Sequence, residues 1–160
     1  MTIREATPED LNAIHALENV CFPENEAASL FSFSQRLAVF PHHFWLLEEE
    51  DQLIGFINGM VTHRDTISDD MFAEAALHDD QGSWQSIFGL AVSPQHRKKG
   101  YAERLIRHLI SVAKQQRRKG VSLTCKEYLI AYYEKLGFCN DGLSQSVHGG
   151  EVWYDLKAEF

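Results

Sequence analysis

The segment HRKKGYAERLI, residues 96–106, combines charge and backbone freedom in a way that suits an anion. Arg97, Lys98 and Lys99 precede Gly100, and an apolar helical pattern begins directly afterwards. A helix N-terminus leaves about four backbone N–H groups unpaired and carries roughly half a positive charge. Glycine lets a phosphate approach these groups, so the segment predicts a phosphate or pyrophosphate cradle. A solvated helix start is the alternative, because neither GxxxxGK[ST] nor GxGxxG is present.

Cysteines and histidines give weaker signals. The three cysteines, Cys21, Cys125 and Cys139, show no CxxC spacing, which is typical of reduced thiols. We interpret Cys125 as a buried apolar side chain. No HExxH motif and no Cys/His pair occurs, so the sequence predicts no metal site. Six histidines are interpreted as exposed polar surface: His15, His42, His43, His63, His78 and His108.

The elements around the cradle are readable from their apolar patterns. Residues 86–92 form one continuous apolar run, which predicts a buried central strand. A helix follows from residue 102, with an apolar stripe at Ala102, Leu105, Ile106, Leu109, Val112 and Ala113. Gly120 is expected to cap it. Residues 121–125 predict a second buried strand, and residues 128–136 predict a helix that Gly137 ends.

The remaining segments predict further strands and helices. We expect a strand at 3–6, a helix with a stripe at Leu11, Ile14, Leu17 and Val20, and a helix at 29–39. Residues 44–62 indicate a hairpin, and 63–83 a polar loop or a short exposed helix at 71–77. From Phe138 onward, a strand pair surrounds a turn at 148–150. This order predicts one α/β or α+β domain spanning residues 1–160.

Composition separates the chain into two differently charged halves. The net charge is −8, and residues 1–85 carry 16 acidic and 3 basic side chains, whereas residues 86–160 carry 7 and 12. This division suggests one cationic and one anionic ligand. No apolar run approaches the roughly 18 residues of a membrane span, and the charged start is unlike a signal peptide. We therefore expect a cytoplasmic protein without a membrane partner.

Two motifs in register give the sequence a family resemblance. The run FGLAV, followed by Arg97-Lys98-Lys99-Gly100-Tyr101-Ala102, resembles the [RQ]xxGx[GA] signature of the GNAT superfamily of N-acetyltransferases. Residues 131–138, AYYEKLGF, resemble that family's YEKLGF segment. CFPENEAAS at 21–29 and SVHGG at 146–150 are similar to the serotonin (arylalkylamine) N-acetyltransferase-like branch. The resemblance covers nearly the whole chain.

The resemblance implies a fold and a cosubstrate. The GNAT fold is a mixed, mostly antiparallel sheet, flanked by helices, with a V-shaped opening between two central strands. Acetyl-coenzyme A would lie in that opening. Leu90, Ala91 and Val92 would bind its pantetheine arm through backbone groups. Its pyrophosphate would lie against the residues of the cradle: Arg97, Lys98, Lys99, Gly100, Tyr101, Ala102 and Glu103.

The resemblance also implies catalytic residues. Tyr133 would be the general acid, because a phenol with a pKa of about 10 keeps its proton at neutral pH. The two histidines used by vertebrate members of the branch are absent, since Ser86 and Phe88 stand at those places. Glu26 resembles the glutamate of insect members and could take the amine's proton, directly or through water, or hold the ammonium. Glu24 and His148 are competing candidates.

These expectations combine into one function with several alternatives. We predict an acetyl-coenzyme A-dependent transfer to the primary amine of a small molecule, such as an arylalkylamine or a polyamine. Phe22, Phe31, Phe33 or Trp84 could contact its apolar part, and acidic residues at 24–26 and 65–80 could attract its charge. The alternatives are a protein or peptide N-acetyltransferase and a non-catalytic acetyl-coenzyme A-binding module. A nucleic-acid binder using the basic helix is disfavoured by the net charge of −8. The oligomeric state, monomer or homodimer, stays open.

Overall fold

The computed structural model describes residues 1–160 and contains five α-helices and nine strands. The helices are α1 (Leu11–Cys21), α2 (Leu30–Val39), α3 (Asp69–Ala73), α4 (Tyr101–Gln115) and α5 (Ile130–Glu134). The strands are β1 (Thr2–Glu5), β2 (Phe44–Glu49), β3 (Gln52–Asn58), β4 (Val61–Thr62), β5 (Trp84–Ile87), β6 (Gly89–Val92), β7 (Gly120–Cys125), β8 (Cys139–Leu143) and β9 (Tyr154–Glu159). None of the helices has the length and hydropathy needed to cross a bilayer.

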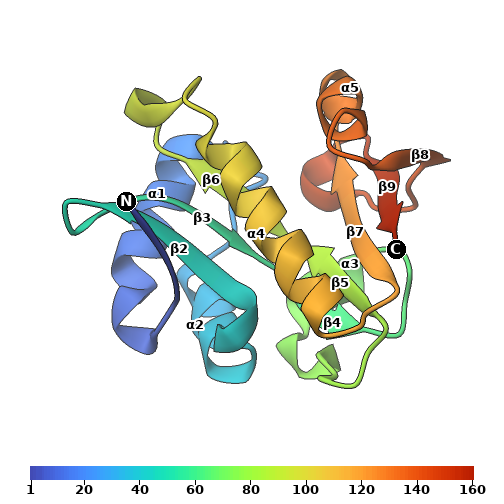
Figure 1. Cartoon of the computed structure of the whole chain (residues 1–160), viewed down its shortest axis with the longest axis horizontal. Helices are drawn as coiled ribbons and strands as arrows, with labels where there is room; N and C mark the ends of the chain where they lie inside the picture. Colours follow the sequence, from blue (N-terminus) through green and yellow to red (C-terminus); the bar gives the residue numbers. More distant parts are fainter.

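The strands form two sheets that separate from one another between β6 and β7. One sheet has the order β1-β2-β3-β6, and the other has the order β4-β5-β7-β9-β8. All pairings are antiparallel except that of β5 with β7. Helix α4 crosses between the two sheets in Figure 1, and α5 lies beyond the end of β7. The predicted mixed, mostly antiparallel sheet with an opening between two central strands is thus confirmed.

The prediction of one strand over residues 86–92 was wrong. The run is divided into β5 and β6 at Phe88, whose N–H still bonds to the Asn58 carbonyl. Gly59 packs directly against Ser86, and the Gln85 amide donates to the Gly59 and Ser86 carbonyls. These contacts hold β5 in one sheet while β6 continues in the other. The same division places residues 61–62 in β4, outside the hairpin that residues 44–62 predicted.

The helices bury their predicted faces with one exception. Helix α4 buries Leu105, Ile106, Leu109 and Ala113 against the largest core cluster. Helix α1 buries Ile14 and Leu17 as expected, whereas Val20 is 63% exposed. Its third buried residue is Glu18, only 6% exposed. Position 18 follows Ile14 by one helical turn, so the carboxylate lies on the core-facing side of the helix.

Two further expectations need correction. Of the loop and the short exposed helix that the sequence left open at 71–77, the structure has a short helix, α3, which buries Met71 in a small core with Phe40, Met60 and Ile67. Gly120 is the first residue of β7 and does not cap α4. The chain leaves that helix through Arg117, whose φ of 61° is left-handed. Gly120 is required instead by packing, since a Cβ there would lie 2.4 Å from the Ala158 carbonyl oxygen.

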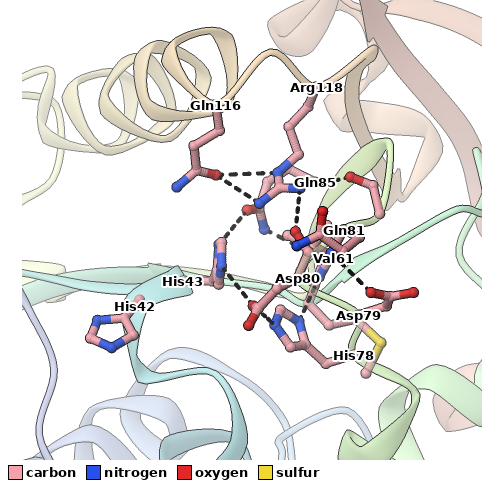
Figure 2. Close-up of polar contacts among 12 residues, drawn as sticks. His42, His43, Val61, His78, Asp79, Asp80, Gln81, Gln85, Gln116 and Arg118 are labelled. Atoms are coloured by element: carbon pink, nitrogen blue, oxygen red, sulfur yellow. Dashed lines mark hydrogen bonds and ion pairs between the residues drawn. The ribbon is translucent and has the colours of Figure 1, made fainter.

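His43 and His78 are not surface residues, contrary to the sequence interpretation. His43 is 4% exposed, and its Nδ1 lies 2.9 Å from Gln85 Oε1. The Gln85 amide nitrogen donates elsewhere, so His43 Nδ1–H is the donor in this contact. Figure 2 shows His43 between Gln85 and Asp80. Arg118, which follows α4, donates a hydrogen bond to the Asp80 carbonyl. The group ties the β4–β5 connection to the start of β2.

Folding also brings His43, His78 and Asp80 within 4.8 Å of one another, a set of ligand types that could hold a metal. The hydrogen bonds of His78 already define which of its ring nitrogens carries the proton. The Val61 N–H donates to His78 Nδ1 at 3.0 Å, so the ring proton is on Nε2 and bonds to Asp80 Oδ1 at 2.6 Å. A metal would need the lone pair at that Nε2. The arrangement therefore favours a hydrogen-bonded support over a metal centre.

We expect His43 to make the fold sensitive to acid. Burial lowers its pKa to about 4, below the 6.5 of an accessible histidine. Between these two pH values the unfolded chain binds a proton that the folded chain does not. The contribution of His43 to the free energy of unfolding is therefore fully present above pH 6.5 and falls toward pH 4, by up to about 3 kcal/mol. His43→Gln keeps a donor for Gln85 and removes this loss. Urea unfolding at pH 7, 5.5 and 4 measures it.

The adjacent His42 provides the control for this prediction. It is exposed, and its hydrogen bond to Glu5 raises its pKa, which is the opposite shift. His42→Gln should therefore keep the full acid-dependent loss of stability. If His43→Gln and the wild type lost the same free energy of unfolding between pH 7 and 4, His43 would not be the group responsible.

Candidate active site

A cavity of about 490 Å³ lies where the cradle segment faces the opening between the sheets. Nine of the ten residues that the sequence named for cofactor binding line it: Leu90, Ala91, Val92, Arg97, Lys98, Gly100, Tyr101, Ala102 and Glu103. The tenth, Lys99, is exposed outside the wall. His96 also lines this cavity, and its Nδ1 is buried without a partner. Strand, turn and helix therefore converge on one concave surface.

The turn before α4 has the backbone geometry of an anion site. Gly100 is the N-cap residue with a φ of 81°, and Lys98 also has a left-handed φ of 64°. A Cβ at Gly100 would meet no atom within 4 Å, so backbone conformation, and not crowding, explains the glycine. The first N–H groups of α4 have no acceptor within the helix. Together with Arg97 and Lys98, they favour a diphosphate at this helix start.

Strand β6 offers one free edge to the cavity. Its partner on one side is β3, with Leu90 opposite Ile57 and Ala91 opposite Phe56. No strand pairs on the other side, because β7 bonds to β5 and β9. The Val92 carbonyl accepts from Arg97 Nε at 3.1 Å and from Cys21 Sγ at 3.4 Å. An extended amide-containing chain could pair with this edge as a strand would.

A second cavity of about 380 Å³ adjoins the first. The two share the following wall residues: Cys21, Phe22, Leu90, Arg97, Leu129 and Tyr133. Besides Tyr133, four aromatic side chains contribute to its wall: Phe22, Phe88, Tyr128 and Trp153. Its charged wall residues are Glu18, Glu26, Arg97 and Lys126. We call it the acceptor cavity, because a second reactant entering here would meet the contents of the first.

Tyr133 lies at the junction of the two cavities. The residue is 8% exposed, and its ring packs edge-on against Phe138 at 5.8 Å and Tyr132 at 5.3 Å. Burial is the main cause that raises the pKa of its phenol above the usual 10. The group is therefore protonated at neutral pH and can donate to an atom between the cavities. Tyr132 lines only the first cavity.

Glu26 lies in the wall of the acceptor cavity, and it is already ion-paired. Its Oε2 accepts a hydrogen bond from Lys126 Nζ at 2.9 Å, and its side chain is 9% exposed. Lys126 follows β7, and its ammonium lies 5.8 Å from the Trp153 ring centre. The pair joins the loop after α1 to the end of β7 across the cavity. Glu24, the competing candidate, is exposed and outside this wall.

His148 supports the loop that carries Glu26. Its Nε2 donates to the Glu26 carbonyl at 2.9 Å, and Asn25 Nδ2 donates to the Gly149 carbonyl at 2.9 Å. A Cβ at Gly149 would lie 2.7 Å from the Asn25 carbonyl oxygen, so the close approach requires glycine. The segments 21–29 and 146–150, distant in sequence, are thus in contact. His148 itself does not line either cavity.

Cys125 has the inert character that the sequence suggested. It is 3% exposed at the end of β7, and burial raises the pKa of its thiol to about 11. The thiolate is the nucleophilic form of cysteine, and it is scarce at neutral pH under these conditions. Although Cys125 lines the acceptor cavity, its thiol is therefore a poor nucleophile.

The structure brings other residues to the acceptor cavity than the sequence named. Of the four aromatics proposed, only Phe22 lines it, since Phe33 and Trp84 are core residues and Phe31 is on the surface. No residue from 65–80 lines it either, and Asp65 and Asp70 pair with Lys157 and Arg64. Phe88, Tyr128, Trp153 and Glu18 were missed. Only Glu18 gave a signal, through its helical spacing from Ile14.

Comparisons with known proteins agree with this geometry. A family model described as Acetyltransferase (GNAT) family matches residues 11–138. The fold is similar to a GphF GNAT-like decarboxylase in complex with isobutyryl-CoA, with TM-score 0.87, 19% identity and 99% of each chain covered. It is also similar to the loading GNATL domain of CurA from Lyngbya majuscula, with TM-score 0.86, 17% identity, and 99% and 96% coverage.

A third similar structure is the ribosomal-protein-S18-alanine N-acetyltransferase from Escherichia coli. It has TM-score 0.74 and 18% identity, and the match covers 99% of this chain and 92% of that one. Such identities establish a shared fold. No curated protein matches the sequence significantly.

The residues present fit acetyl-coenzyme A. The helix start of α4 suits its diphosphate, and the free edge of β6 suits its amide-containing arm. The first cavity, which we call the cofactor cavity, joins both. Acetyl-coenzyme A supplies an activated acetyl thioester. The family match covers most of the chain, including the cradle and Tyr133. The protein is therefore an acyltransferase with acetyl-coenzyme A as cosubstrate, and it belongs to the GNAT acetyltransferase family.

Proposed function

We propose that the whole chain acts as one N-acetyltransferase domain that acetylates the primary amine of a small, partly aromatic molecule. The observation that carries this proposal is the acceptor cavity, which meets the cofactor cavity at Tyr133. Its volume of about 380 Å³ is in the range of small-ligand sites. Four aromatic side chains suit an apolar body, and two carboxylates suit an ammonium. An arylalkylamine combines these features, in keeping with the branch resemblance.

The proposed chemistry assigns one task to each group. Backbone N–H groups of β6 polarise the thioester carbonyl, and both reactants are held together in adjoining cavities. Tyr133 donates its proton to the departing sulfur. Glu26, ion-paired to Lys126, holds the ammonium of the acceptor. Direct attack follows, without an acyl-enzyme.

Two other functions are separated by one experiment. Acetyl transfer is measured with purified protein, acetyl-coenzyme A and a panel containing 2-phenylethylamine, tryptamine, spermidine and short peptides with free N-termini. We expect the arylalkylamines to have the highest kcat/KM. A preference for peptides would support a protein N-acetyltransferase, as in the Escherichia coli structure. Tight acetyl-coenzyme A binding without transfer to any member would support the non-catalytic module.

Glu26→Gln tests the ammonium-binding role. The change removes one negative charge from the cavity wall and leaves Lys126 without its carboxylate partner. A hydrogen bond to a charged group contributes about 1.5–3 kcal/mol, so KM for 2-phenylethylamine should rise roughly tenfold, with kcat within about threefold. Steady-state kinetics measure both. Glu24→Gln is the matched control, and equal KM values for the two variants would contradict the role.

A further inference from the structure

Glu18 is a buried carboxylate with one unused oxygen. It lies near the end of α1 and is 6% exposed. Its Oε2 accepts a hydrogen bond from the Ala28 N–H at 2.8 Å, which fixes the side chain against the loop that carries Glu26. Its Oε1 is buried and has no hydrogen-bond partner, although the residue lines the acceptor cavity. An unpaired buried carboxylate oxygen is costly, so it calls for a functional explanation.

A second buried charge lies close to this carboxylate. Arg36 of α2 is 6% exposed, and its Nη1 donates to Asn58 Oδ1 at 2.9 Å. Its guanidinium packs 5.2 Å from the ring centres of Phe33 and Phe88. Arg36 attracts Glu18 electrostatically without a direct ion pair. The positive charge therefore supports an ionised Glu18 while leaving Oε1 unpaired.

Glu18 belongs to the wall of the acceptor cavity. The same wall includes Gly89 and Leu90, where β6 begins, and Tyr133, where the cofactor cavity begins. Glu26 lies in this wall too, but one of its oxygens is bonded to Lys126. Of the two carboxylates, only Glu18 has a buried side-chain oxygen without a hydrogen-bond partner.

We propose that Glu18 is the base that removes the proton from the acceptor's ammonium group, directly or through one water molecule. This inference rests on the proposed function. The freed lone pair on nitrogen forms the bond to the acetyl carbon as the carbon–sulfur bond breaks. Nitrogen loses two protons in all. One passes to Glu18 Oε1 and then to solvent, and the other replaces the proton that Tyr133 gives to sulfur.

The surroundings of Glu18 suit a base. Burial, the largest cause, raises its pKa above the usual glutamate value, which makes the ionised group a stronger proton acceptor. Three groups act in the other direction: the Ala28 N–H, Arg36 of α2, and His148 of the turn His148–Gly150. The Cys21 thiol on its own helix also faces it, and burial raises the pKa of that thiol.

The test uses Glu18→Gln in the full chain with two acceptors. 2-Phenylethylamine is an ammonium ion at pH 7 and needs a base, whereas 2,2,2-trifluoroethylamine is neutral at that pH and does not. We expect kcat to fall about a hundredfold with the first amine and less than fivefold with the second. The acidic limb of kcat against pH, present in the wild type, should move with the first amine to the alkaline pH at which the amine itself loses its proton. Calorimetry should give an acetyl-coenzyme A Kd within twofold of the wild type.

Each outcome decides between the roles. Equal losses of kcat with the two amines would show that Glu18 is only structural, and an unchanged kcat and acidic limb would overturn the proposal. If Glu18→Gln does not bind acetyl-coenzyme A, Glu18→Asp replaces it. That variant keeps a carboxylate and should keep the acidic limb, with roughly tenfold lower kcat. A folded Glu18→Asp variant without the acidic limb would contradict the inference. A wild type inactive on both amines would instead refute the proposed function.

Discussion

Tyr133→Phe is expected to lower kcat about a thousandfold while the affinity for acetyl-coenzyme A stays within twofold of the wild type. General acid catalysis contributes roughly 10² to 10⁴-fold, and this substitution removes only the hydroxyl. The ring keeps its packing against Phe138 and Tyr132, so the fold and the cofactor cavity should be preserved. Steady-state kinetics with the best amine, together with calorimetry for acetyl-coenzyme A, measure the two quantities separately.

Tyr132→Phe is the matched control for this prediction. The neighbouring tyrosine is 38% exposed and lines the cofactor cavity without reaching the acceptor cavity. Removal of its hydroxyl should change kcat by less than threefold.

The phenol of Tyr133 should also keep its proton at alkaline pH, because burial raises its pKa. The wild type should therefore show no loss of kcat up to pH 10 from this group. Turnover of Tyr133→Phe at the wild-type rate would remove the acid assignment.

Gly59→Ala is expected to cause the largest loss of stability. A Cβ at this position would lie 2.0 Å from the Ser86 carbonyl oxygen and 2.5 Å from its carbon, and both are backbone atoms that cannot rotate away. The two strands would have to separate at the point where the sheets divide. We expect the free energy of unfolding to fall by about 3 kcal/mol or more, which corresponds to roughly 10 °C in Tm for a chain of this size.

Gly142→Ala separates crowding from backbone strain. Gly142 has a φ of 98°, yet a Cβ there would meet no atom within 4 Å. Only the conformational cost of the left-handed region remains, roughly 1–2 kcal/mol. Differential scanning calorimetry of both variants should give the larger shift for Gly59→Ala by a clear margin. Equal shifts would mean that the close contact between Gly59 and Ser86 does not hold the strands together.

Local sequence was sufficient for the parts of the site whose residues are adjacent in the chain. The cradle at 97–103 depends on cations, a glycine and a helix start that are contiguous, so its geometry follows from local backbone rules. Helix α4 was likewise predictable, since its stripe recurs at steps of three and four. The family resemblance added the cosubstrate and Tyr133, which apolar spacing alone would have placed in the core.

The tertiary structure decided what depends on residues far apart in the chain. Glu26 meets Lys126 across 100 positions, and Cys21 meets Val92 across 71, so the walls of the acceptor cavity exist only after folding. The division of residues 86–92 was equally hidden, because apolar character reports burial and not which sheet a strand joins.

Glu18 and His43 show the same limit at single residues. Sequence pattern assigns a charged or polar side chain to the surface by default, since burial of such groups is costly. The chain buries both, because Ala28 fixes Glu18 and Gln85 fixes His43. The sequence by itself predicted the class of fold and nine residues that line the first cavity, because these residues are near one another in the chain. Only packing between distant segments decided which carboxylate of the acceptor cavity has a buried, unpaired oxygen, because that depends on the hydrogen bonds of all its neighbours.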